Sequence, residues 1–560
     1  MTVIDQVKIS WEKLRVNFEK FPSLGAGLVF VSVFLLYASV YLASPGFLFK
    51  DDHFFHFKYA YLIRTQGWTA VQNFRWIPIN LNQSLAYPLT LFNLALIPFT
   101  YFKNLELGLK ISDIFWASLS VSTIYWVFRK LKLKGAAFWI LALVSVIFFA
   151  ERMLVGRALV LVPAFLMLEL YFAKEKKYFK FFFVSLLQIV WHPATLFFPV
   201  VMALLVEAAR ILAGSKFSWK SLPGAGVALL VGLKLISFDL LGFLRQVLDV
   251  QLTAIQKANS PAVAIGGSEL YPVDLFKVLE SSEIFLLLLL VCFGIVIFCY
   301  VSAKRKKAFS LDKEDGTLVF SAFLFALMSL VGSMSVSGRL FDYYFVAVVF
   351  LAASVATILL KRKAIVVQAT PRKVFLGGLT IFFLVATLSS FLNIKREMDG
   401  GHYRLIGEVA TWVGERSNEN EKVFLDNWSF FPVVFFYNSK NFYNTGLEPE
   451  IVRWRDAPLY WKWYNILVYR MYCDQPLDCA TAQEKFTATL KTASEAQKQQ
   501  LKQENSRKII ESIKNDFGAH FVIVSGELGN VLDLNPDLII AKIEKRSETD
   551  DVNIRGYELK

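Results

Sequence analysis

Long apolar runs recur along most of this sequence, and they constrain its fold more than any other feature. Most runs hold roughly 16 to 22 residues with few charges and a few are shorter, and a helix rising 1.5 Å per residue needs about 20 such residues to cross a bilayer core. The runs lie near 24–43, 109–128, 136–150, 158–173, 180–193, 195–211, 223–242, 283–302, 316–335, 341–361 and 374–392. The sequence therefore predicts a polytopic α-helical membrane protein with about eleven transmembrane helices.

The amino-acid composition also favours a membrane protein. Hydrophobic residues make up 55% of the 560-residue chain and charged residues only 19%, and a soluble domain has no core large enough to bury that share. The net charge of +14 comes from short basic clusters rather than from one basic stripe, which argues against nucleic-acid binding. The first 22 residues show no cleavable signal pattern, so 24–43 is expected to remain as the first span.

Basic clusters follow alternate apolar runs, and Lys and Arg are enriched in cytoplasmic loops. The clusters are Lys8 to Lys20, Arg129 to Lys134, Lys174 to Lys180, Arg210 to Lys220, Lys304 to Lys307 and Lys361 to Lys373. Placing all of them inside requires a cytoplasmic N-terminus and an odd number of spans, as the apolar runs give. The extracytoplasmic side then receives the loops 44–108 and 243–282 and everything after Asn393.

The composition changes near residue 392, where aromatic and charged residues begin to interleave. We expect a transmembrane domain over 1–392 and an extracytoplasmic domain over 393–560. The second domain has the pattern of a polar helix at 482–515 and of short strands at 521–524 and 538–540. This mixture predicts a small α/β domain.

Two further features of the C-terminal domain bear on its structure. Cys473 and Cys479 are close in sequence and lie on the expected oxidising side of the membrane, so we expect them to form a disulfide. The aromatic segment Phe430-Phe431-Pro432 is compatible with a ligand-binding surface and with an ordinary core.

Two adjacent acids, Asp51 and Asp52, stand in the first outer loop just after the first span. The residues that follow have helical spacing, which places His56 on the same face as Asp52 and makes Gly67 a stop signal. A carboxylate here suits a general base that accepts a proton from a hydroxyl group. Equally, it suits a cap for the N-terminus of a helix, and Asp52 can do both.

The spacing in this loop resembles that of the GT-C superfamily of membrane glycosyltransferases. Asp52 is followed by Ala60 at plus eight and Gly67 at plus fifteen, which is similar to the protein O-mannosyltransferases, the aminoarabinose transferases and the catalytic subunits of oligosaccharyltransferases. The resemblance implies a GT-C-like fold, a polyprenyl-phosphate-linked sugar donor, and Asp52 rather than Asp51 as the family's acid.

A leaving lipid phosphate requires cations, and Arg152 and Arg157 follow the third run on the outer side. Arg64, near the end of the first outer helix, is a third candidate for phosphate binding. The alternative for Arg152 and Arg157 is that they reach toward lipid headgroups. Metal-binding members of the superfamily carry acids in this second outer loop. Here Leu159 to Leu161 occupy the corresponding region and leave only Glu151, so no metal is expected.

Other polar residues gather on the same side. His192 lies at a helix break before a proline and is a candidate for substrate contact or for bonding an exposed carbonyl group. Arg339 and Asp342 stand in an outer turn and are candidates for ligand contact or for a mutual ion pair. The loop 243–282 has the length of an active-site lid.

Together these features predict an integral membrane glycosyltransferase of the cell envelope, in a bacterial inner membrane. It would move a sugar from a lipid-linked donor to a glycan, lipid or protein acceptor, with inversion if displacement is direct. A transporter or flippase of lipid-linked glycans is the main alternative, although it would need polar residues across the midplane. A catalytically inactive membrane scaffold is the second.

Overall fold

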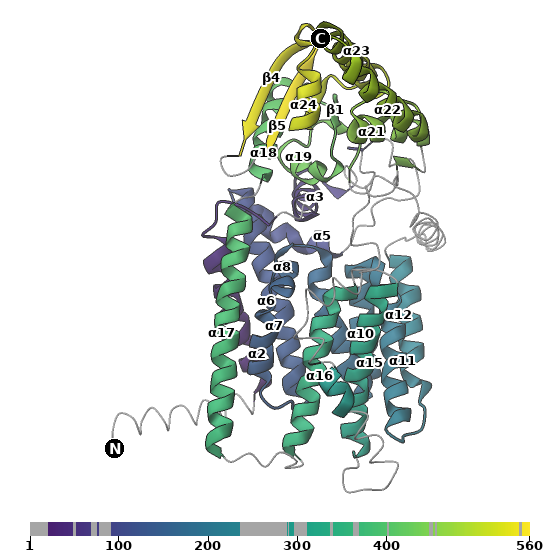
Figure 1. The fold of residues 1–560 in the computed structure, drawn as a ribbon. Coiled ribbons are helices and arrows are strands. Elements are labelled where there is room, and N and C mark those ends of the chain that lie inside the picture. Colours follow the sequence, from purple (N-terminus) through teal and green to yellow (C-terminus); the bar gives the residue numbers. More distant parts are fainter. Residues whose placement is uncertain are drawn as a thin grey trace, which may run out of the picture.

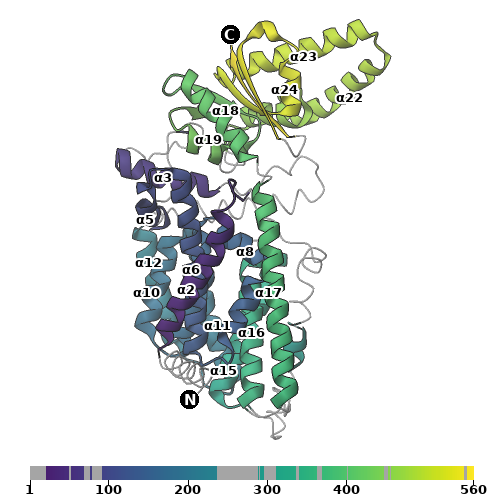
Figure 2. The same cartoon turned by 90° about the vertical axis from the view of Figure 1, so that its left-hand side faces the viewer.

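The chain forms a helical bundle with an α/β domain stacked on one end of it (Figures 1 and 2). The computed structural model describes residues 21–48, 52–68, 76–77, 91–235, 288, 290–295, 311–335, 340–361, 369–399, 402–446, 452–453, 456–547 and 552–560. The expected lid 243–282 and most of the expected span 283–302 lie outside these ranges, as do the candidates Asp51 and Arg339.

The bundle consists of helices that follow the apolar runs. They are α2 (Pro22–Tyr41), α6 (Leu105–Lys130), α7 (Ala136–Val144), α8 (Ile147–Leu154), α9 (Val162–Lys174), α10 (Tyr178–Trp191), α11 (Phe198–Leu212), α12 (Leu222–Leu235), α15 (Lys313–Ser335), α16 (Phe341–Lys361) and α17 (Ala369–Asp399). Figure 2 shows α2, α6, α16 and α17 running along the length of the bundle. Their apolar faces pack into one continuous core.

Within the described residues, six segments are long and apolar enough to cross a membrane, or seven if α7 and α8 count as one span. The expected number was about eleven. Part of the difference arises because α9 and α10 are short, with 13 and 14 residues. The rest concerns the expected spans 223–242 and 283–302, which lie partly or mostly outside the described residues. Proline explains the limits of α9 and α10. Pro163 lies in the first turn of α9, which follows the short 3-10 helix η3 (Ala158–Leu161), and α10 ends before Pro193.

Between α2 and α6 the chain forms short helices at the end of the bundle that faces the C-terminal domain (Figure 1). They are α3 (Asp52–Gln66), α5 (Leu91–Leu96) and the 3-10 helix η2 (Ile97–Tyr101). Asp52 is the first residue of α3, where a carboxylate is favoured by the helix dipole, and Gly67 follows the helix with a φ of 84°. The sequence-based start and stop of α3 are therefore both observed.

The C-terminal part combines helices with a five-stranded sheet of order β2-β1-β3-β5-β4. Its helices are α18 (Tyr403–Arg416), η9 (Trp428–Phe430), α19 (Phe431–Tyr437), α21 (Ala457–Tyr469), α22 (Pro476–Thr492), α23 (Glu495–Asn515), α24 (Gly526–Leu532) and η10 (Pro536–Leu538). Its strands are β1 (Lys422–Leu425), β2 (Phe442–Tyr443), β3 (Phe521–Ser525), β4 (Ile539–Arg546) and β5 (Asn553–Leu559). Strands β2, β1 and β3 are parallel, whereas β5 is antiparallel to β3 and β4.

This arrangement is the mixed α/β domain expected from the sequence, with two differences in detail. The helix α17 runs to Asp399, beyond the boundary expected at residue 392. The polar stretch 482–515 is divided between two helices, because Ser494 caps α23 through a reciprocal pair of hydrogen bonds with Gln497. Cys473 and Cys479 are joined by a disulfide, with their Cα atoms 5.4 Å apart.

The C-terminal domain rests directly on α3. The ring of Phe436 in α19 lies 5.3 Å from that of Phe54 and 6.4 Å from that of Phe57. On the neighbouring face of α3, Phe55 contacts Phe431 and Phe435 at 6.3 and 5.8 Å. The aromatic residues of α19 therefore build the interface that holds α3 in place, which is the core interpretation of that segment.

Candidate active site

The candidate site centres on an ion pair between Asp52 and Arg157. Nε of Arg157 lies 2.8 Å from Oδ2 of Asp52. The Asp52 side chain is 37% exposed and that of Arg157 is 17% exposed, so the pair lies at the surface of the packed bundle rather than inside it. The pair thus joins the candidate base with one of the candidate phosphate ligands, which are more than 100 residues apart in the sequence.

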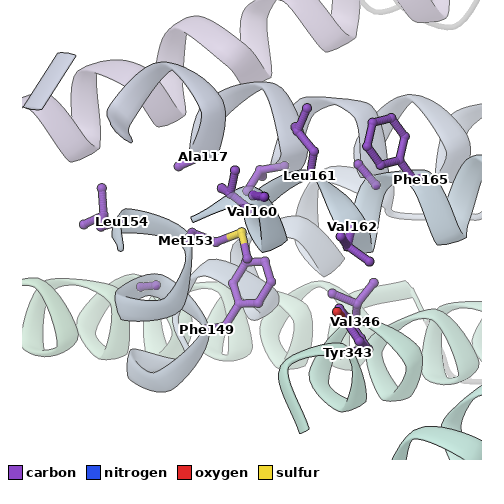
Figure 3. Packing of buried hydrophobic residues seen from close by; sticks show 14 of the residues in the cluster. Ala117, Phe149, Met153, Leu154, Val160, Leu161, Val162, Phe165, Tyr343 and Val346 are labelled. Carbon is purple, nitrogen blue, oxygen red and sulfur yellow. The ribbon is translucent and has the colours of Figure 1, made fainter. Parts of the chain in front are cut away.

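Arg157 reaches Asp52 because the loop between α8 and η3 is anchored by the core on both sides. Figure 3 shows Phe149 and Met153 of α8 close to Val160 of η3, with Tyr343 of α16 below them. All four side chains are almost fully buried. The loop turns at Gly156, whose φ of 49° favours glycine. A short loop held in this way gives Arg157 a defined backbone position.

Arg152 has a different environment from Arg157. Its Nε and Nη2 donate hydrogen bonds of 2.9 and 2.7 Å to Oδ1 and Oδ2 of Asp342, at the start of α16. Both side chains are 6% exposed. A bidentate contact of this kind compensates both buried charges. The structure therefore pairs Asp342 with Arg152, a partner that the sequence analysis did not consider.

His56 lies one helical turn after Asp52 and is largely buried. Its Nδ1 is 2.8 Å from Oδ1 of Asn93 in α5. Burial lowers the pKa of His56, although the charge of Asp52 and the contact with Asn93 act in the opposite direction. A neutral imidazole beside the acid is the state that follows near pH 7.

A series of edge-to-face aromatic contacts connects His56 to the loop that carries Arg157. The ring of Phe92 lies 5.2 Å from that of His56 and 5.3 Å from that of Trp191. The Trp191 indole donates a 2.7 Å hydrogen bond to the carbonyl oxygen of Ala158, next to Arg157. Sequence analysis missed Phe92, Asn93 and Trp191, because nothing in their local pattern separates them from ordinary helix residues.

Two other candidate residues, Arg64 and His192, make contacts of their own. Arg64 lies twelve residues after Asp52 on α3, about 18 Å away at 1.5 Å per residue. There it donates hydrogen bonds of 2.9 and 3.2 Å to Thr100 and lies over the ring of Tyr101. The backbone of His192 caps α10, and its carbonyl oxygen accepts hydrogen bonds from Thr195.

A second polar cluster that the sequence analysis missed lies directly behind the ion pair. It contains Tyr41, His53 and Asp113, all buried. The signal was present, because Asp113 is an acid inside the apolar run 109–128, and ionisable residues within spans are rare and usually functional. Among the described residues, no group of three or more His, Cys, Asp or Glu side chains is arranged to hold a metal ion.

Comparison with known proteins decides the fold. No protein family model matches the sequence, and no curated protein matches it. Among solved structures, the chain is similar to the apo crystal structure of ArnT from Cupriavidus metallidurans, with a TM-score of 0.51 over 96% of this chain and 98% of that one. The chain has the ArnT fold, which confirms the GT-C-like fold expected from the sequence. The sequences are 11% identical, so the likeness shows the fold alone.

The GT-C fold gives the site its context. The likeness extends over nearly the whole chain, so it includes both the helical bundle and the C-terminal domain. Together with the long apolar helices, it establishes an integral membrane protein. The helix α3 packs against α19 where the two parts of this fold meet (Figure 1). Asp52 is the first residue of α3, and Arg157 is paired with it.

Proposed function

We propose that this protein transfers a sugar from a polyprenyl-phosphate-linked donor to a hydroxyl group of an acceptor on the extracytoplasmic face of a bacterial inner membrane. The observation that carries the proposal is the 2.8 Å ion pair between Asp52 and Arg157 at the domain junction of a GT-C fold. A carboxylate and a guanidinium side by side supply the two groups that such a transfer needs.

Asp52 is the general base in this proposal. Its carboxylate accepts the proton of the acceptor hydroxyl while the hydroxyl oxygen bonds to the anomeric carbon. The bond between that carbon and the phosphate oxygen breaks at the same time, and the polyprenyl phosphate leaves with the electron pair. Direct displacement inverts the configuration of the anomeric carbon.

Arg157 stabilises the phosphate as it departs. A guanidinium has five N–H donors in a fixed plane, so contact with a carboxylate through Nε is compatible with phosphate binding by the same group. Arg152 is left out of this role because its Nε and Nη2 are engaged by Asp342 in a buried ion pair. Arg64 is left out because it is held at the far end of α3 by Thr100.

The direction of the chain across the membrane is part of the proposal. The basic clusters favour a cytoplasmic N-terminus and a C-terminal domain on the outer side. The disulfide between Cys473 and Cys479 supports this placement, because disulfides persist in oxidising compartments. The donor would then reach Asp52 through the lipid phase, and the acceptor would approach beneath the C-terminal domain.

The test is transfer of labelled sugar from lipid-linked donors in membranes that contain the protein. We compare wild type with Asp52→Asn at matched expression, and Asp51→Asn is the neighbouring control. The proposal expects a loss of at least about 100-fold for Asp52→Asn, the scale of general-base catalysis, and a small effect for Asp51→Asn. The reverse pattern would assign the base to Asp51.

Arg157 is tested in the same assay. Arg157→Lys keeps the charge but loses the planar donor group, so it should retain more transfer than Arg157→Ala. Equal activity of wild type and Arg157→Ala would remove Arg157 from the mechanism. If wild type transfers no sugar while lipid-linked glycan crosses the bilayer, the chain is a transporter and the enzyme proposal fails.

A further inference from the structure

The polar cluster behind Asp52 lies where three helices meet. Tyr41 is the last residue of α2, His53 is the second residue of α3, and Asp113 lies in α6. The Tyr41 hydroxyl donates a 3.1 Å hydrogen bond to Oδ2 of Asp113, and Nδ1 of His53 is 3.2 Å from the same oxygen. Each residue is at most 1% exposed. One carboxylate oxygen therefore connects the end of α2 and the start of α3 to α6.

Stability alone is a weak explanation for this cluster. Removing a carboxylate from water is costly, and apolar residues of similar volume often replace buried ion pairs without loss. A buried polar contact does, however, restrict the packing to one arrangement, because its partners must be satisfied. The contact between Asp113 and His53 therefore holds the segments around it in one arrangement.

The other oxygen of Asp113 faces the loop that carries Arg157. A Cβ atom on Gly156 would lie 2.1 Å from Oδ1 of Asp113 and 2.7 Å from Cβ of His53. Gly156 thus packs against both Asp113 and His53, at a distance that only glycine permits. The residue after Gly156 is Arg157, and the residue before His53 is Asp52. One contact therefore fixes the two backbone segments that carry the ion pair.

We propose that Asp113 is a positioning residue for Asp52 and Arg157. One of its oxygens holds His53, and the other faces Gly156, so its carboxylate sets the separation between the start of α3 and the loop between α8 and η3. The inference rests on the proposed function in assigning Asp52 and Arg157 to the transfer step. The geometry it describes can be measured without any activity.

The first experiment measures that geometry by cross-linking. In a chain with Cys292→Ser and Cys299→Ser, cysteines replace Asp52 and Arg157, and a short bifunctional thiol reagent joins them in membranes. Adding Asp113→Asn should slow cross-linking at least fivefold. The control is Ser118→Ala, since Ser118 is also buried in α6 and its hydroxyl donates a 2.7 Å hydrogen bond to the carbonyl oxygen of Ile114 in the same helix. Cross-linking at the same rate with Asp113→Asn would overturn the proposal.

The second experiment measures transfer kinetics. A displacement of about 1 Å at a reacting group costs on the order of 100-fold in rate, so Asp113→Asn should lower kcat by about 10- to 100-fold while KM stays nearly unchanged. Tyr41→Phe should have a smaller effect, because His53 still contacts Asp113. In an Asp52→Asn background, Asp113→Asn should lower the residual rate no further.

The outcomes separate this inference from the proposed function. A merely structural role predicts that kcat falls only with the amount of folded protein, or falls equally in the Asp52→Asn background, and either result overturns the inference. If wild type transfers no sugar at all, the proposed function fails. The cross-linking rate still decides whether Asp113 positions the two segments.

Discussion

Arg152 and Asp342 form a buried ion pair, with N–O distances of 2.9 and 2.7 Å, that joins α8 to α16. Each residue is 6% exposed, so neither charge is well solvated. Asp342 directly precedes Tyr343 near the start of α16, and α8 leads directly into the loop of Arg157. The pair therefore helps to hold the loop that carries Arg157.

Removing one partner should leave the other charge buried without the contact that this pair supplies. We expect Arg152→Met to destabilise the protein by about 3–5 kcal/mol, and Asp342→Leu by a similar amount. The double variant should recover most of this loss, because it removes both charges. Thermal unfolding in detergent measures the effect. A stable double variant that no longer transfers sugar would instead make Arg152 a phosphate ligand.

Trp191 tests the aromatic support of the same loop. Trp191→Phe keeps a ring against Phe92 but loses the hydrogen bond to Ala158, which is worth about 1 kcal/mol. We expect a small loss of stability and a several-fold fall in transfer, since Ala158 follows Arg157. Trp116→Phe is the matched control, because its buried Nε1 has no hydrogen-bond partner within the described part of the chain. Equal effects of the two variants would show that only ring size matters.

The sequence allowed the helices to be predicted better than the site. Apolar runs and caps are local signals, so the first span, the start of α3 at Asp52 and its end before Gly67 could be located in advance. The division between α22 and α23 could have been predicted as well, because Ser494 and Gln497 have the spacing of a capping box.

The pairing of charges could not be predicted, because it depends on contacts between distant segments. Arg152 and Asp342 are 190 residues apart. Local spacing instead suggested ligand contact or an ion pair between Asp342 and Arg339, and Arg339 lies outside the described residues. Asp113 was conspicuous as an acid within an apolar run, yet its contact with His53 depends on how α3 lies across α6. Topology alone brings Asp52 and Arg157 together.

Lys58 gives a prediction about pH. It is 9% exposed and lies near the rings of Tyr61 and Phe436, at the contact between α3 and α19. Burial lowers the pKa of Lys58 from 10.5 to about 8. Between these two values the unfolded chain binds more protons than the folded one, so stability should rise with pH across this window.

Replacing Lys58 should remove that dependence. We expect Lys58→Met to be at least as stable as wild type at pH 7, because a buried charge is lost and the apolar stem is kept. Its unfolding midpoint should change less than that of wild type as the pH rises above 8. Lys103→Met, at an exposed position, is the control. A steeper pH dependence in Lys58→Met than in wild type would contradict the argument.

The disulfide between Cys473 and Cys479 gives a prediction about both stability and topology. The two residues are six positions apart, and closing so short a loop is expected to stabilise the folded chain by about 2 kcal/mol. Reduction, or replacement of both cysteines by serine, should lower the unfolding midpoint and leave the Asp52 site unchanged, because the disulfide lies in the C-terminal domain. In intact cells the two thiols should resist alkylation until a reductant is added. Thiols that react without reductant would place this domain in a reducing compartment and contradict the proposed orientation.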